Sequence, residues 1–185
     1  MNATRRKTLT AIAIPDLLEA LEGHRERIEA AKQALVEHPS HARVAALTAL
    51  LEAAANESGE ADNLHEQVQA VADEEQEAFD NLSEGLQQSA MGQRIGEAVD
   101  FLTAASDSLT EVEGHLNDAL EACGSIAQVL SGVIEDTEGR LWFDYETRSE
   151  LDAIEALAEV TVDGLTNAID AAQYALDEIE QAIGC

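Results

Sequence analysis

The strongest constraint on the fold is a run of apolar residues from position 95 to 133, spaced at alternating steps of three and four. Its members are Ile95, Ala98, Leu102, Ala105, Leu109, Val112, Leu116, Ala119, Cys123, Ile126, Leu130 and Val133. Side chains at this spacing line one side of an α-helix, and a repeat kept over about five heptads is typical of a left-handed bundle or coiled coil. The run predicts a helix at about 90–136. Because large residues alternate with alanine, we expect close approach to a neighbouring helix.

A similar run, with one slip, predicts a last helix at about 149–183, capped by Ser149. Its members are Leu151, Ile154, Ala158, Val162, Leu165, Ile169, Ala172, Leu176, Ile179 and Ile183. Further helices are predicted at about 15–38, 40–54 and 61–82, with Pro15 in a first turn and Ser40 as an N-cap. A loop is expected near 56–59 and a polar turn at 83–89.

The composition favours helices, because alanine, leucine and glutamate dominate and aromatic residues are only 3%. We therefore expect an all-α fold, an elongated antiparallel and coiled-coil-like bundle of four to five helices. A near-neutral helical hairpin is expected at 1–55 and a strongly acidic long-helix bundle at 61–185.

Residues 44–185 contain 32 acidic and three basic side chains, a local net charge of −29. Such a charge opposes folding through self-repulsion, and solubility alone needs a net charge of only about 2–8. Packed as three helices of about 70 Å, the segment would carry about one acid per 2.2 Å, against about one charge per 1.7 Å of duplex DNA. The acidity therefore favours a surface that binds a basic partner.

The acids follow the helical repeat on a different side from the apolar residues. One row is Glu97, Asp100, Asp107, Glu111, Asp118 and Glu121, and a second row is Asp152, Glu155, Glu159, Asp163, Asp170, Asp177 and Glu180. Lysines normally relieve repulsion between such neighbours, and the chain has only Lys7 and Lys32. We expect both rows to contact the partner as one outward negative ridge. Trp142, in the aromatic segment 141–145, is a candidate contact residue or part of an apolar plug at the end of the bundle.

Three stretches resemble a group of short acidic helical proteins encoded by bacteriophages and prophages. They are the cluster Arg5-Arg6-Lys7-x-Leu9, the segment DEEQEAFDNLSEGLQQS at 73–89, and Glu-Ala-Val-Asp-x-Leu at 97–102. The resemblance covers about a third of the chain. The sequence departs from that pattern at Ser83, where proline is expected, at Pro15, and in about 50 residues inserted before Asp73. The resemblance implies a phage origin and no particular mechanism.

No motif for catalysis or cofactor binding is present: the sequence has no phosphate-binding glycine loop, nucleophile elbow, kinase signature or paired-cysteine metal motif. The five histidines are expected to be exposed polar residues, because a di-iron bundle needs two Glu-x-x-His units and two further glutamates. We predict no catalytic residue, cofactor or metal. Two distant cysteines and no apolar run long enough for a bilayer predict a soluble, cytoplasmic protein.

The leading hypothesis is a non-enzymatic acidic interaction protein, a phage-encoded inhibitor or nucleic-acid mimic that occupies the basic groove of a host defence or nucleic-acid-binding protein. It would contact no nucleic acid and no membrane directly. Alternatives are a coiled-coil assembly protein that self-associates, such as a homodimer, and a helical protein adapted to a high-salt cytoplasm. The basic cluster at 5–7 is either solvated or paired with the acidic row of a second copy.

Overall fold

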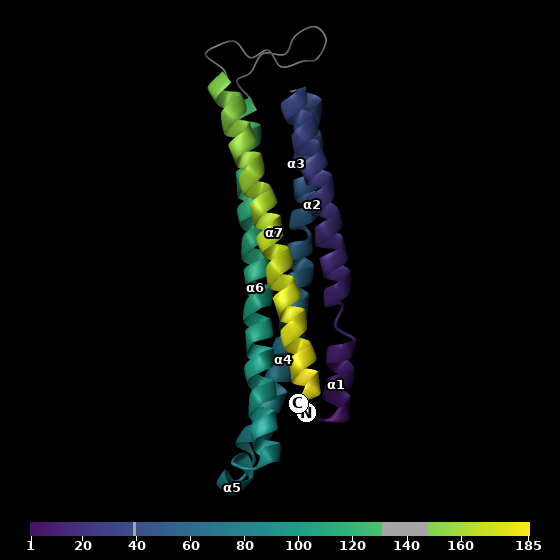
Figure 1. The fold of residues 1–185 in the computed structure, drawn as a ribbon, viewed down its shortest axis with the longest axis vertical. Coiled ribbons are helices and arrows are strands. Elements are labelled where there is room, and N and C mark those ends of the chain that lie inside the picture. The colour runs from purple at the N-terminus through teal and green to yellow at the C-terminus, as the bar shows by residue number, and fades with distance from the viewer. Residues whose placement is uncertain (39, 131–147) are drawn as a thin grey trace. The chain divides into compact units, whose positions relative to one another are not determined.

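The computed structural model describes residues 1–38, 40–130 and 148–185, and this part of the chain contains helices and no strand (Figure 1). The longer helices are α2 (Ile14–Glu37), α3 (His41–Ala55), α4 (Glu57–Asp80), α6 (Ala90–Leu130) and α7 (Arg148–Gly184). Two shorter helices are α1 (Ala3–Thr10) and α5 (Glu84–Gln87). The predicted all-α fold is confirmed.

Local sequence signals explain several helix ends. Pro15 is the second residue of α2, where its missing N–H costs no helical hydrogen bond. The Ser40 side chain caps α3 by accepting a hydrogen bond from the Arg43 backbone N–H, as predicted. The loop expected at 56–59 is only a break at Asn56, because α4 already begins at Glu57.

Contacts divide the chain into two compact units. Unit 1 contains Met1–Leu18, Gly59–Glu113 and Asp170–Cys185, and unit 2 contains Glu19–Ser58 and Gly114–Ile169. The helices α2, α4, α6 and α7 each contribute residues to both units. The structure thus divides the chain differently from the predicted pair 1–55 and 61–185, since segments distant in the sequence assemble each unit.

The core of unit 1 lies between α1, α4, the first part of α6 and the last part of α7. The apolar repeat of α6 is confirmed as its buried side, because all of the following are buried in this unit: Ile95, Ala98, Leu102, Ala105, Leu109 and Val112. In α7 the buried positions differ slightly from the prediction. Leu176 and Ile183 are only half-buried, whereas Ala175 and Ala182 are fully buried. The alanines thus occupy the most buried positions of the helix, and the larger residues flank them.

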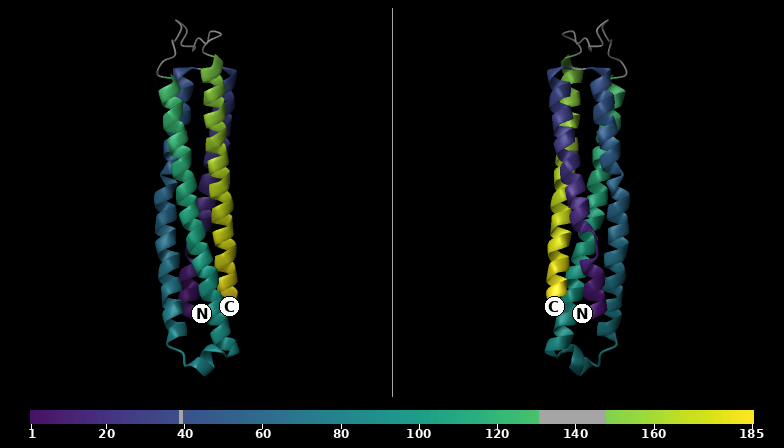
Figure 2. Two further views of the ribbon diagram at one scale, coloured as in Figure 1. Left: turned by 90° about the vertical axis from the view of Figure 1, so that its left-hand side faces the viewer. Right: turned by 90° about the vertical axis from the view of Figure 1, so that its right-hand side faces the viewer.

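The core of unit 2 is built from α2, α3, the second part of α6 and the first part of α7. Its buried residues include Leu21, Ile28, Leu35, Leu47, Leu51, Leu116, Leu165 and Ala168. Figure 2 shows α6 and α7 running antiparallel side by side in this unit. A Cβ added at Gly164 of α7 would lie 3.2 Å from the His115 carbonyl oxygen and 3.3 Å from Ala119 Cβ of α6. The predicted close approach of helices is therefore present here.

Candidate functional site

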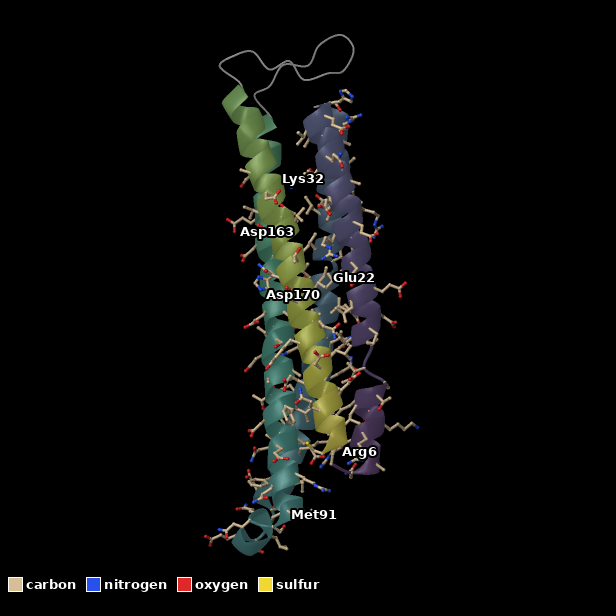
Figure 3. The ribbon with its side chains drawn as sticks, viewed as in Figure 1. Arg6, Glu22, Lys32, Met91, Asp163 and Asp170 are labelled. Atoms are coloured by element: carbon tan, nitrogen blue, oxygen red, sulfur yellow. The ribbon has the colours of Figure 1, made fainter. Side chains whose placement is uncertain are left out.

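The predicted acidic rows are exposed wherever the structure describes their side chains in unit 1. On α6 the exposed members are Glu97, Asp100, Asp107 and Glu111, and on α7 they are Asp170, Asp177 and Glu180. Asp170 is labelled on α7 in Figure 3. At about 3.6 residues per turn, these positions fall on the side of each helix opposite its buried residues. Each row therefore lies on the outward side of its helix.

In unit 2 the rows are shorter and one member is paired with a cation. Asp118 and Glu121 of α6 and Asp163 of α7 are exposed. Lys32 of α2 forms an ion pair with Glu159 of α7, whose side chain is 60% exposed. The side chains of Asp152 and Glu155 are not described, and Trp142 lies outside the described residues.

A third acidic row, which the sequence analysis missed, lies on α4 in unit 1. Its exposed members are Asp62, Glu66, Asp73, Glu77 and Asp80. They follow the same steps of three and four as the predicted rows, with one gap, so the spacing was the signal that could have identified them. The exposed acidic rows of unit 1 therefore lie on the outward sides of three helices, and not only on the two that were predicted. These twelve carboxylates together are called here the three-row surface.

Few cations oppose this surface. The segments of unit 1 contain 19 acidic and four basic side chains, a net charge of −15. Among the side chains that the structure describes, no cation lies in an ion pair with any carboxylate of the three-row surface. Glutamines contact some of them: Gln69 donates to Asp73, Gln76 to Asp80 and Gln173 to Asp177. The charge of this surface is therefore not compensated by ion pairs with the cations that the structure describes.

Arg5 of unit 1 forms ion pairs with acidic residues of the same chain. Arg5 of α1 places Nε 2.9 Å from Glu74 Oε2 and Nη1 3.0 Å from Glu75 Oε1, both on α4. Burial acts to lower the pKa of Arg5, but the hydrogen bond to Glu74, the contact with Glu75 and the charges of both glutamates outweigh it and raise the pKa above its ordinary value. Arg6 and Lys7 are exposed.

Two histidines take part in internal polar clusters, so the expectation of exposed histidines is wrong for them. In unit 2, His24 is buried, with Nε2 3.3 Å from Glu57 Oε1 and Nδ1 3.3 Å from Arg27 Nη2. In unit 1, His65 Nδ1 lies 3.0 Å from the hydroxyl oxygen of buried Ser106, and this hydroxyl donates its hydrogen bond to Gln69 Oε1 at 3.0 Å. Both clusters satisfy polar atoms between neighbouring helices, as buried polar groups require.

A shallow pocket of about 340 Å³ in unit 1 is lined by Met1, Ala90, Met91, Arg94, Ile95 and Cys185. Met91 is 72% exposed, the largest exposed fraction among the large apolar side chains described (Figure 3). Burial, followed by the charge of Glu97, raises the pKa of the Cys185 thiol above its ordinary value despite nearby positive charges. A raised pKa leaves less of the reactive thiolate at neutral pH.

Within the described residues, no group of three or more His, Cys, Asp or Glu side chains is arranged to hold a metal ion. None of the described helices combines the length and the apolar character that crossing a bilayer requires. Comparison with family models, curated proteins and solved structures gave no match to this chain.

Proposed function

We propose that this protein is a non-enzymatic acidic interaction protein that binds a basic groove of a nucleic-acid-binding protein in place of nucleic acid. The observation that carries the proposal is the three-row surface, with twelve exposed carboxylates and no described cation paired to them. Rows of fixed negative charge on stiff helices are similar in sign and arrangement to the phosphate rows of a duplex, although each row has a gap. A phage origin stays the prediction drawn from the sequence resemblance, and inhibition of a host defence protein is part of this proposal.

The mechanism would be competition through charge. A basic groove and an acidic surface attract each other at long range, which accelerates association and makes it depend strongly on salt. The carboxylates of the three-row surface are held on helices that are already folded. Preorganisation reduces the entropy lost on binding.

The proposal is tested by capture from host lysate with two matched variants. One variant neutralises six carboxylates of the predicted rows: Asp100→Asn, Asp107→Asn, Glu111→Gln, Asp170→Asn, Asp177→Asn and Glu180→Gln. The other neutralises the five acids of the α4 row together with Glu60, so both variants change the net charge equally. The captured protein should bind nucleic acid, and duplex DNA should release it.

We expect the first variant to weaken capture at least tenfold, because each lost contact removes charge attraction to the groove. Equal weakening by both variants would mean that the whole three-row surface is used. Capture that neither variant alters, or that rises with salt, would contradict the proposal.

The two alternatives give different results. A self-associating assembly protein would show a mass above that of one chain in light scattering, and the mass would rise with concentration. A chain adapted to high salt would fold only near molar salt, where its carboxylates are screened. The proposal instead expects a folded protein at low salt.

A further inference from the structure

In unit 1 the short basic helix α1 contacts the acidic helix α4 through ion pairs of Arg5. Part of the acidic surface is thus covered by a basic helix of the same chain. α1 spans eight residues, and only Leu9 is buried within it. Six of the others are exposed, and the nonhelical residues 11–13 join α1 to α2. The helix therefore holds to unit 1 through few side chains.

Three side chains of this segment, one paired with α4 and two buried, have the spacing of one helical face. Arg5 reaches Glu74 and Glu75, Leu9 follows four residues later with 2% exposure, and Ile12 follows three residues after that with 7% exposure. The Ile12 backbone N–H bonds the Leu9 carbonyl, which continues the turn beyond the end of α1. The pattern is an arginine followed by aliphatic residues at i+4 and i+7, as in helices that bind in grooves.

Glu75 explains why this place requires a cation. Its side chain is only 1% exposed, and Oε1 has Arg5 Nη1 at 3.0 Å without the alignment of a hydrogen bond. Without the arginine, a buried carboxylate would be left without a counterion, which is strongly unfavourable. A guanidinium suits the place better than an ammonium, because its planar fork reaches Glu74 through Nε and Glu75 through Nη1 at once.

We infer that the face of α4 bearing Glu74 and Glu75 is a binding site for an arginine-bearing amphipathic helix of a basic partner, and that α1 occupies it as an internal competitor. Release of α1 exposes Glu75 and the places of Leu9 and Ile12 together. An incoming helix with the same three-residue pattern restores the ion pair and the apolar contacts. This inference deepens the proposed function, since it names one kind of element that the partner presents.

The inference is tested on the full chain with a labelled peptide of residues 1–13 as the probe. The variant Arg5→Gln removes the internal arginine, and Arg6→Gln is its control, since Arg6 is exposed on the same helix and carries the same charge (Figure 3). Fluorescence anisotropy should show at least tenfold tighter binding of the peptide to the Arg5→Gln chain than to the Arg6→Gln chain, because the internal competitor is weakened. The peptide carrying Arg5→Gln should bind at least tenfold more weakly than the unchanged peptide.

A second measurement needs no variant. In hydrogen exchange of the wild-type protein, amides of α1 should exchange at least tenfold faster than those of the buried part of α4 around Leu64–Ala72, because α1 opens by itself. The inference would be overturned if the amides of α1 exchanged only together with those of α4. It would also be overturned if the wild-type, Arg5→Gln and Arg6→Gln chains bound the peptide equally well. If the Arg5→Gln chain does not fold, hydrogen exchange of the wild-type protein still tests the inference. The comparison of the unchanged peptide with the Arg5→Gln peptide, both bound to the wild-type chain, tests it as well. No captured partner enters these measurements, so their failure is distinct from failure of the proposed function.

Discussion

Gly92, in the first turns of α6, should not tolerate the single methyl group that alanine would add. A Cβ built there lies 2.4 Å from the carbonyl oxygens of Leu86 and Gln87 and 2.6 Å from Gln87 Cα. All three atoms belong to the backbone of α5 and its end, so no side-chain rotation can relieve the contact. Gly96 provides a matched control one turn later, because its Cβ would meet only the Phe79 ring at 3.6 and 3.9 Å, an ordinary van der Waals contact.

The magnitudes follow from two opposing terms. Alanine in place of glycine within a helix gains about 1 kcal/mol of stability. Overpacking that shifts backbone costs about 1–3 kcal/mol, and a clash with two carbonyl oxygens at once favours the upper end. Gly92→Ala should therefore lose about 2 kcal/mol, whereas Gly96→Ala should gain up to about 1 kcal/mol.

Thermal unfolding followed by circular dichroism separates the two variants. For a chain of this length, a difference of about 3 kcal/mol corresponds to a difference of about 6–12 °C in midpoint. We expect Gly92→Ala below the wild type and Gly96→Ala at or above it. A Gly92→Ala chain as stable as the wild type would refute the close approach of α5 to the start of α6.

Two further predictions concern the interior and the thiol of unit 1. Ser106→Ala should lower the free energy of unfolding by about 1–2 kcal/mol, because it leaves Gln69 Oε1 without the Ser106 hydroxyl. Ser108→Ala should change it little, since the Ser108 hydroxyl bonds only the Ala104 carbonyl of its own helix. Denaturant unfolding of both variants measures the difference, and equal losses would contradict the prediction. In a Cys123→Ser chain, Cys185 should react with iodoacetamide more slowly at pH 8 than a free thiol does, because its raised pKa keeps it protonated to higher pH. Glu97→Gln should speed this reaction, and an unchanged rate would exclude the charge of Glu97 as a cause.

The parts of the fold that the sequence predicted best are the helices with a long and regular apolar repeat. The heptad repeat identified α6 and its buried side from Ile95 to Ala119, because about five heptads of consistent spacing leave one solution for the core. The same reasoning located α7 but favoured its large residues, whereas Ala175 and Ala182 are more buried than Leu176 and Ile183. Alanine is a weak signal in a sequence although its small size suits tight helix packing.

Contacts between distant segments were not predictable in this way. The ion pair of Arg5 with Glu74 joins residues 69 positions apart, and α1 has a single buried residue within the helix, so neither leaves a periodic signal. The segments that make up the two compact units were also not predictable, because they depend on which parts of continuous helices contact each other. The acidic rows of α6 and α7 were predicted as exposed surfaces, yet the row on α4 follows the same spacing and was overlooked.

The acidic rows and the buried repeat have the same period but lie on opposite sides of each helix. The surface charge of this protein can therefore be changed without changing the residues of its core. A residue that keeps steps of three and four but lies opposite the core never contacts the core, so the carboxylates of the three-row surface contribute repulsion and little packing. Replacing several of them with asparagine or glutamine should therefore leave the helices intact and relieve repulsion by a few tenths of a kcal/mol per like-charged pair. Selection for stability alone would favour such neutral or lysine-bearing rows. The absence of a described ion pair to these acids is the physical reason to seek a basic partner for them.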